Sequence, residues 1–235
     1  WIDSEAPVDR RIDLKIQDGC DAMCAFCVIP FARGRSRSRE VGDAVAEAAS
    51  LARRGARELV LTGVNLGEYR DGDVDLPALI DRLAEAAPGA RIRLSSIEPS
   101  FVTRAIVERM ADPDHPLVPF LHVPLQSGSE RILAAMKRGH TAAAFLDLTL
   151  AAAEKLPGAG FGTDVMAGFP GETDADFEAT LGLLEASPVD YAHVFPYSER
   201  PGTAASRAPG DRVPPDIVAK RVNALLAFSR ARRQR

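Results

Sequence analysis

The chain has 235 residues, of which 46% are hydrophobic and 26% are charged, and its formal net charge is −4 at pH 7. This composition is typical of a globular protein with a core of its own, and it excludes a disordered chain or a fibrous repeat. No apolar run reaches the roughly 18 to 20 residues of a membrane helix, and the N-terminal WIDSEAPVDRR lacks the apolar centre of a secretory signal, so we expect a cytoplasmic protein.

Short apolar segments alternate with helical patterns along the whole chain. Strands are predicted at residues 12–16, 58–63, 91–97, 117–125, 160–169 and 189–197. Helices are predicted, from apolar residues three and four positions apart, at residues 45–52, 76–83, 102–110, 129–137, 141–155, 177–184 and 218–226. Six strand–helix units of this kind indicate a parallel α/β sheet, either doubly wound or closed into a full or partial barrel.

Polar and glycine-rich segments follow each predicted strand. They begin at Cys20 and include residues 63–65, 95–98, 126–128, 168–172 and 196–198. Because parallel strands end at the same edge of their sheet, we expect the functional residues at that edge.

The three cysteines of the chain, Cys20, Cys24 and Cys27, form a C-x3-C-x2-C motif directly after the first predicted strand. Thiolates this close together can ligate one soft metal centre. Structural zinc would need a fourth ligand, which one of the four histidines could supply: His115, His122, His140 or His193. A 4Fe-4S cluster held by three thiolates would instead leave one iron open to bind a substrate or cofactor.

The segment CDAMCAFC, with Phe26 before the last cysteine, resembles the signature of radical S-adenosylmethionine enzymes. The wider segments IQDGCDAMCAFCVIPFARGRSRSRE, LTGVNLGEY, LSSIEPS, HVPLQSGSERILAAMKRGHT, TDVMAGFPGET and FPYSERPGTAA resemble the central domain of the methylthiotransferases. The sequences of these segments are most similar to those of the subgroup that acts on N6-threonylcarbamoyladenosine in tRNA. The resemblance implies a partial (β/α)6 TIM-like barrel of the radical SAM type.

The resemblance also implies the reaction. The three cysteines would hold three irons of a 4Fe-4S cluster, and the fourth iron would bind S-adenosylmethionine, whose reductive cleavage gives a 5′-deoxyadenosyl radical. This radical would start 2-methylthiolation of the modified adenosine at position 37, in the tRNA anticodon loop, with a reductase as electron donor. Residues 1–235 would be one catalytic domain excised from a longer enzyme, since residue 1 is Trp. A second 4Fe-4S cluster in an N-terminal domain, and a C-terminal RNA-binding domain, would lie outside it.

The same resemblance assigns contacts with S-adenosylmethionine. Phe26 would lie beside the adenine, Gly63 and Asn65 near the amino group, Ser95, Glu98, Gln126 and Ser127 near the ribose and carboxylate, Arg138 near the methionine carboxylate, and Asp164 at the rim after the fifth strand. Two of these residues have a simpler alternative role. Ser127, or the nearby Ser129, could be the N-cap of the following helix, and Phe26 could simply anchor its loop.

Arg33, Arg35, Arg37 and Arg39 alternate with small residues, so an extended segment would place all four guanidinium groups on one side. Such a ridge could bind RNA phosphates, although a solvated charged loop would have the same pattern. Two other functions remain open: methylthiolation of a ribosomal-protein aspartate, and, from a different class, a non-catalytic zinc-stabilised RNA-binding module.

Overall fold

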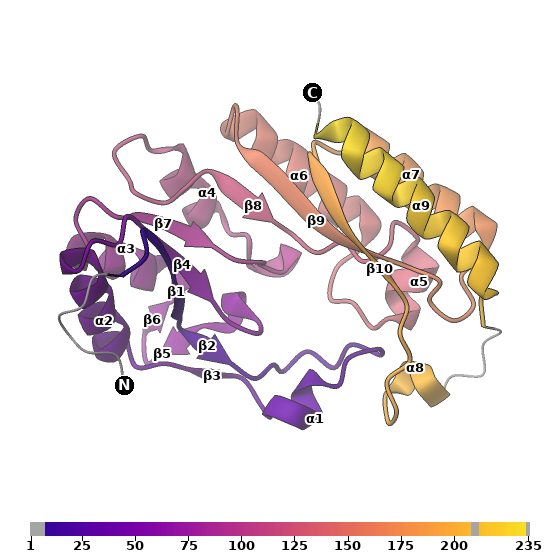
Figure 1. Ribbon diagram of the computed structural model, residues 1–235, viewed down its shortest axis with the longest axis horizontal. Coiled ribbons are helices and arrows are strands. Elements are labelled where there is room, and N and C mark those ends of the chain that lie inside the picture. Colours follow the sequence, from indigo (N-terminus) through magenta and orange to yellow (C-terminus); the bar gives the residue numbers. More distant parts are fainter. Residues whose placement is uncertain (1–7, 208–211, 234–235) are drawn as a thin grey trace. The chain divides into compact units, whose positions relative to one another are not determined.

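The computed structural model of the chain describes residues 8–207 and 212–233, so most of the N-terminal segment discussed above lies outside the described residues (Figure 1). The chain forms two compact units. The first runs up to Asp21 and continues over Arg33–Leu121, and the second contains Ala22–Ala32 and the residues from His122 onward.

The first unit is built on a parallel sheet of strand order β1-β4-β7, formed by Arg11–Lys15, Glu58–Thr62 and Arg91–Leu94. The register aligns Leu14, Leu61 and Leu94 across the three strands, and all three leucines are buried. Two helices pack against each other beside this sheet, α2 (Val41–Arg53) and α3 (Leu76–Ala86), and α4 (Arg104–Ala111) follows β7. The Asp75 side chain caps α3 by accepting from the Ala78 amide.

Several short elements complete the first unit. Among the described residues, two antiparallel pairs of very short strands are present: β2 (Gln17–Asp18) with β3 (Arg37–Ser38), and β5 (Arg70–Asp71) with β6 (Val74–Asp75). There are also two 3-10 turns, η1 (Leu66–Glu68) and η2 (Pro99–Phe101). None of these was predicted, because elements of two or three residues are too short to show a periodicity.

The second unit is built on a sheet of strand order β10-β9-β8, formed by Tyr191–Pro196, Gly160–Ala167 and Phe120–His122, and His122 is the residue of β8 that belongs to this unit. The helix α9 (Pro215–Arg232) packs along β10, and α6 (Ala142–Lys155) contacts α7 (Asp174–Ala186) (Figure 1). The remaining helices are short: α1 (Ile29–Arg33), α5 (Glu130–Ala135) and α8 (Ala204–Arg207).

All six predicted strands and all seven predicted helices are present, although their ends shift by several residues. The largest change among the strands is in β8, which covers Phe120–His122 instead of 117–125. Pro119 and Pro124 flank this strand and have no amide hydrogen to donate to a neighbouring strand, which keeps the regular ladder short.

Candidate functional site

Each cysteine sulfur accepts a hydrogen bond. All three cysteines are free thiols of intermediate burial. The Asn65 side-chain amide lies 3.8 Å from Sγ of Cys20 in the first unit. In the second unit, Nη1 of Arg138 lies 3.4 Å from Sγ of Cys24, and the Ile29 amide lies 3.4 Å from Sγ of Cys27. Such donors stabilise a thiolate and tune the reduction potential of a cluster that it ligates.

The segment that carries Cys24 and Cys27 is fixed to its own unit by backbone hydrogen bonds. The Ala25 amide donates to the Met136 carbonyl at 2.8 Å, and the Ala205 amide donates to the Ala25 carbonyl at 2.7 Å. Phe26 packs against the buried cluster formed by Ala25, Ile132, Met136, Phe169 and Ala205. The loop-anchoring role considered for Phe26 is therefore confirmed, and its contact with an adenine stays a prediction.

Gln17 is a residue of the site that the sequence analysis missed. Its buried side chain donates to the Gly19 carbonyl and to Oγ of Ser36, both at 2.9 Å, and its Oε1 accepts from the Asn65 amide at 2.9 Å. A Cβ at Gly63 would lie 2.8 Å from Oε1 and 2.9 Å from Cβ of Gln17, so only glycine fits there. Gln17 thus joins the backbone before Cys20 to Asn65.

We expect the Gln17→Ala variant to unfold at a lower urea concentration, with a loss of about 1–3 kcal/mol, because the substitution leaves the buried Asn65 amide and Gly19 carbonyl without partners. Lys15→Ala is the control, since the Lys15 side chain is 58% exposed. Equal midpoints for the two variants in urea denaturation would contradict the assigned role of Gln17.

Asn65 also has a free acceptor. Its Oδ1 is buried and has no hydrogen-bond partner among the described residues. A buried polar atom without a partner needs a structural or functional reason, and an ammonium group of a ligand would supply the missing donor. Ser95 and Glu98, both half-buried, follow the end of β7 in the same unit, and the Ser95 amide donates to the Leu61 carbonyl. Their expected ribose and carboxylate contacts stay predictions.

Gln126 has a left-handed backbone, with φ of 70°, which is uncommon for a residue with a side chain. Its amide donates to the Asp164 carbonyl at 2.8 Å, and its own carbonyl accepts from the Met166 amide at 2.9 Å, so β9 holds this strained conformation on both sides. Strain of this kind is frequent at functional sites, which is compatible with the expected cofactor contact.

The expected contact between Ser127 and S-adenosylmethionine stays a prediction, and the structure shows a capping role beside it. Ser127 is 0% exposed, and its Oγ accepts from the Ser129 amide at 3.2 Å and lies 3.4 Å from Oγ1 of Thr180. Ser129 is the N-cap of α5 and accepts from the Ile132 amide. The capping alternative is therefore confirmed for Ser129, and Ser127 supports this cap by accepting from the Ser129 amide.

Asp164 lies inside β9, three residues before its end, and not at the rim where it was expected. Its Oδ1 is 3.0 Å from Nε2 of His122 and 3.4 Å from Nδ1 of His193. The other two histidines also have partners: Nε2 of His115 lies 3.3 Å from Asp81, and Nε2 of His140 lies 3.2 Å from the Leu125 carbonyl. None of these contacts joins a histidine to a cysteine, so they give no support to a histidine as fourth ligand of a zinc–thiolate site.

The arginine ridge is largely paired with acidic residues. Arg33 is the last residue of α1, so the expectation that all four arginines share one extended segment is wrong. The pairs, all within the first unit, are Arg33 and Arg37 with Asp18, Arg35 with Asp21, and Arg39 with Asp43 and Glu47. A hydrogen bond from Lys15, with further contributions from the Gly19 amide and Arg37, lowers the pKa of Asp18 to about 2. Arg33, Arg35 and Arg37 remain exposed and could exchange these partners for phosphates.

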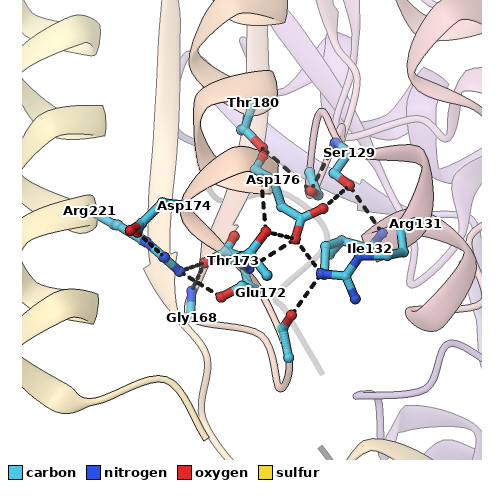
Figure 2. A network of polar contacts seen from close by, with 12 residues as sticks. Ser129, Arg131, Ile132, Gly168, Glu172, Thr173, Asp174, Asp176, Thr180 and Arg221 are labelled. Carbon is cyan, nitrogen blue, oxygen red and sulfur yellow. Dashed lines mark hydrogen bonds and ion pairs between the residues drawn. The ribbon is translucent and has the colours of Figure 1, made fainter. Parts of the chain in front are cut away.

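The turn after β9 is held by a buried ion pair (Figure 2). Arg221 of α9 donates from Nη1 to Oε2 of Glu172 at 2.7 Å, and Glu172 also accepts from the Gly168 amide at 2.7 Å. Burial raises the pKa of Glu172, and the bonds from Gly168 and Arg221 oppose this effect. The acidic end of the GFPGE segment therefore anchors α9.

No helix within residues 8–207 and 212–233 has the length and apolarity required to cross a lipid bilayer.

Comparison with known proteins extends the sequence resemblance. The chain matches the family model of the Radical SAM superfamily over residues 14–184. It is 40% identical to a tRNA-2-methylthio-N(6)-dimethylallyladenosine synthase of Chlorobium limicola over 213 residues, which is 90% of this chain and 48% of that protein. It is also 40% identical to the threonylcarbamoyladenosine tRNA methylthiotransferase MtaB of Bacillus subtilis over 232 residues, 97% of this chain and 51% of that protein. The chain thus spans about half the length of these curated relatives.

Solved structures share the fold at low sequence identity. The radical S-adenosylmethionine methyltransferase TsrM from Kitasatospora setae is 19% identical with a TM-score of 0.69, and the match covers 83% of this chain and 38% of that one. Coproporphyrinogen III oxidase HemN from Escherichia coli is 18% identical with a TM-score of 0.68, over 97% of this chain and 54% of that one. These likenesses confirm the predicted fold class. Because the family match covers residues 14–184, which is more than half of the chain and includes the cysteine motif, the chain belongs to the radical SAM superfamily.

Proposed function

We propose that this chain is the catalytic part of a tRNA methylthiotransferase that binds a 4Fe-4S cluster through Cys20, Cys24 and Cys27. The observation that carries the proposal is the C-x3-C-x2-C motif within the family match, in which every sulfur accepts an N–H hydrogen bond. When bound, the cluster would supply the electron that cleaves the sulfonium bond of S-adenosylmethionine.

The residues of the chain would bind and orient the cofactor. Oδ1 of Asn65 is the free acceptor for the amino group, and Ser95, Glu98 and Gln126 offer hydroxyl, carboxylate and amide groups for the ribose and carboxylate. The contact of Arg138 with the methionine carboxylate stays a prediction. Its Nη1 also donates to Cys24, and we propose that the positive charge there would ease reduction of a cluster.

Direct reconstitution tests this proposal. After anaerobic incubation with iron and sulfide, we expect about four irons per chain. Addition of a reductant and S-adenosylmethionine should then release 5′-deoxyadenosine and methionine, measured by liquid chromatography. Tight zinc binding without any nucleoside product would overturn the proposal and favour the zinc-stabilised RNA-binding module.

We expect Arg138→Gln to make the reduction potential of the cluster more negative, on the order of tens of millivolts, because the change removes a positive charge beside Cys24 Sγ. The measurement is a redox titration followed by electron paramagnetic resonance. Lys137→Gln, at the neighbouring exposed position, is the matched control and should keep the wild-type potential. A potential unchanged in Arg138→Gln would contradict this role.

For the substrate, we propose the N6-threonylcarbamoyl form of adenosine 37 in tRNA. Support comes from the relative named for threonylcarbamoyladenosine, which aligns with 97% of this chain, and from the exposed Arg33, Arg35 and Arg37. The relative named for dimethylallyladenosine is equally identical, so the dimethylallyl form is the nearest competing substrate.

The substrate is tested with the protein in the full length that its gene encodes. The protein is incubated separately with tRNA carrying threonylcarbamoyladenosine, with tRNA carrying dimethylallyladenosine, and with the ribosomal protein that carries the target aspartate. Mass spectrometry of digested products should show the methylthio group only on the threonylcarbamoyl nucleoside. Methylthiolation of either other substrate instead would overturn this choice and leave the cluster chemistry standing.

A further inference from the structure

We propose that His122, Asp164 and His193 form a binding site for one divalent transition-metal ion that uses none of the cysteines. All three residues belong to the second unit. One ligand atom from each lies within 4.8 Å of the others, and this is the only such group of histidine, cysteine and acidic side chains found among the described residues. The proposal is independent of the function proposed above.

The strand register brings these side chains together. His193 of β10 is the direct cross-strand neighbour of Asp164 of β9, so both project from the same face of the sheet. His122 ends β8 on the other side of β9. Three adjacent parallel strands therefore contribute one ligand each, which is a rigid way to hold a metal.

Two of the three ligand-to-ligand distances are those of a coordination sphere, and the third pair, His122 and His193, lies within 4.8 Å. Two ligands that each lie about 2.1 Å from a metal, at angles between tetrahedral and octahedral values, are about 3.0–3.4 Å apart. Oδ1 of Asp164 lies 3.0 Å from Nε2 of His122 and 3.4 Å from Nδ1 of His193. Small rotations of the side chains would place an ion between the three atoms without moving the strands.

The second nitrogen of His122 also has a hydrogen-bond partner that can fix the orientation of the ring. Its Nδ1 lies 3.0 Å from the hydroxyl of Tyr191. This bond can hold the proton on Nδ1 and leave the lone pair of Nε2 directed at the site. A Cβ at Gly162 would lie 2.4 Å from the Tyr191 hydroxyl and 2.6 Å from Nδ1 of His122, so the absence of a side chain makes room for the bond.

The charge and exposure of the site fit a divalent ion with open coordination positions. Two neutral imidazoles and one carboxylate are typical ligands of zinc, cobalt(II) or iron(II), and three protein ligands leave further positions for water or a ligand. His122 and Asp164 are largely enclosed, with side-chain exposures of 6% and 18%, whereas the His193 side chain is 53% exposed and gives an ion access.

The test uses cobalt(II) as the probe. The 235-residue chain with all three cysteines replaced by serine is titrated with cobalt chloride, and visible absorption reports the bound ion. We expect this cysteine-free chain to bind one ion. Adding His193→Ala to it should weaken binding at least tenfold, and adding His115→Ala instead should leave binding unchanged. His193 is exposed, so its replacement does not disturb the core. His115 is the matched control, since it also contacts an aspartate, but Arg109 pairs with that aspartate.

A second measurement covers the case in which the serine variant does not fold. The wild-type chain without a cluster is titrated instead, and bands without sulfur-to-cobalt charge transfer identify ions bound through histidine and carboxylate. Equal binding in the wild-type and His193→Ala chains, or no binding in either, would overturn the proposal. His122, Asp164 and His193 would then be a hydrogen-bonded cluster only.

Discussion

The Cys24→Ala variant is expected to release 5′-deoxyadenosine more than about 100-fold more slowly than the wild-type chain, because removal of one of three thiolates leaves the proposed cluster without a full ligand set. The measurement is nucleoside release after anaerobic reconstitution, together with iron content per chain. The fold of the variant should survive, since Cys24 is only partly buried and its segment is held by the Ala25 backbone bonds.

Met23→Ala is the matched control for this substitution. Met23 precedes Cys24 in the same segment and is 50% exposed, so its truncation removes no ligand and no core contact. It should retain wild-type iron content and product release. A Cys24→Ala chain that kept both would show that Cys24 is not a cluster ligand, and the proposed function would fail with it.

The main elements of the fold could be predicted because their sequences are periodic. The strands β4 and β9 and the helices α2 and α3 lie where apolar alternation or helical spacing placed them. The helix α1 was missed because its five residues contain a proline and have no apolar period. Because Arg33 ends this helix, it is not part of an extended segment with the three arginines that follow it.

The site could be predicted only in part. The cysteine motif is a local pattern, so sequence was enough to find it. The hydrogen bond from Arg138 to Cys24 joins residues that are 114 positions apart, and no local pattern reveals it. Similarly, the alternation of TDVMAG and YAHVFP puts Asp164 and His193 on one face of each strand, but only the register shows that they are neighbours.

The Arg221→Met variant is expected to lose about 3–5 kcal/mol of unfolding free energy, because it leaves the buried Glu172 carboxylate without its cationic partner. Arg221 is 5% exposed, and its guanidinium links α9 to the turn after β9 (Figure 2). Its second bond, to Asp174, counts for little, since the Asp174 side chain is 92% exposed. Urea denaturation at pH 7 measures the loss.

Two comparisons separate this ion pair from a general effect on α9. Lys220→Ala changes the preceding, exposed residue of the same helix and should alter stability by less than about 0.5 kcal/mol. Adding Glu172→Gln to Arg221→Met should restore part of the loss, because a neutral amide is far cheaper to bury than an unpaired carboxylate. No recovery in the double variant would contradict a role for the Glu172 charge.

The loss in Arg221→Met should also depend on pH, with a sign set by Glu172. Burial raises the pKa of Glu172 above its ordinary value of 4.5, and loss of Arg221 removes a contact that opposes this rise. An acid whose pKa is higher in the folded state binds protons more tightly there, so protonation favours folding. The deficit of the variant relative to the wild-type chain should therefore be largest near pH 7 and should shrink as the pH falls toward 4.5. A deficit that grew on acidification would mean that groups other than Glu172 dominate at this turn.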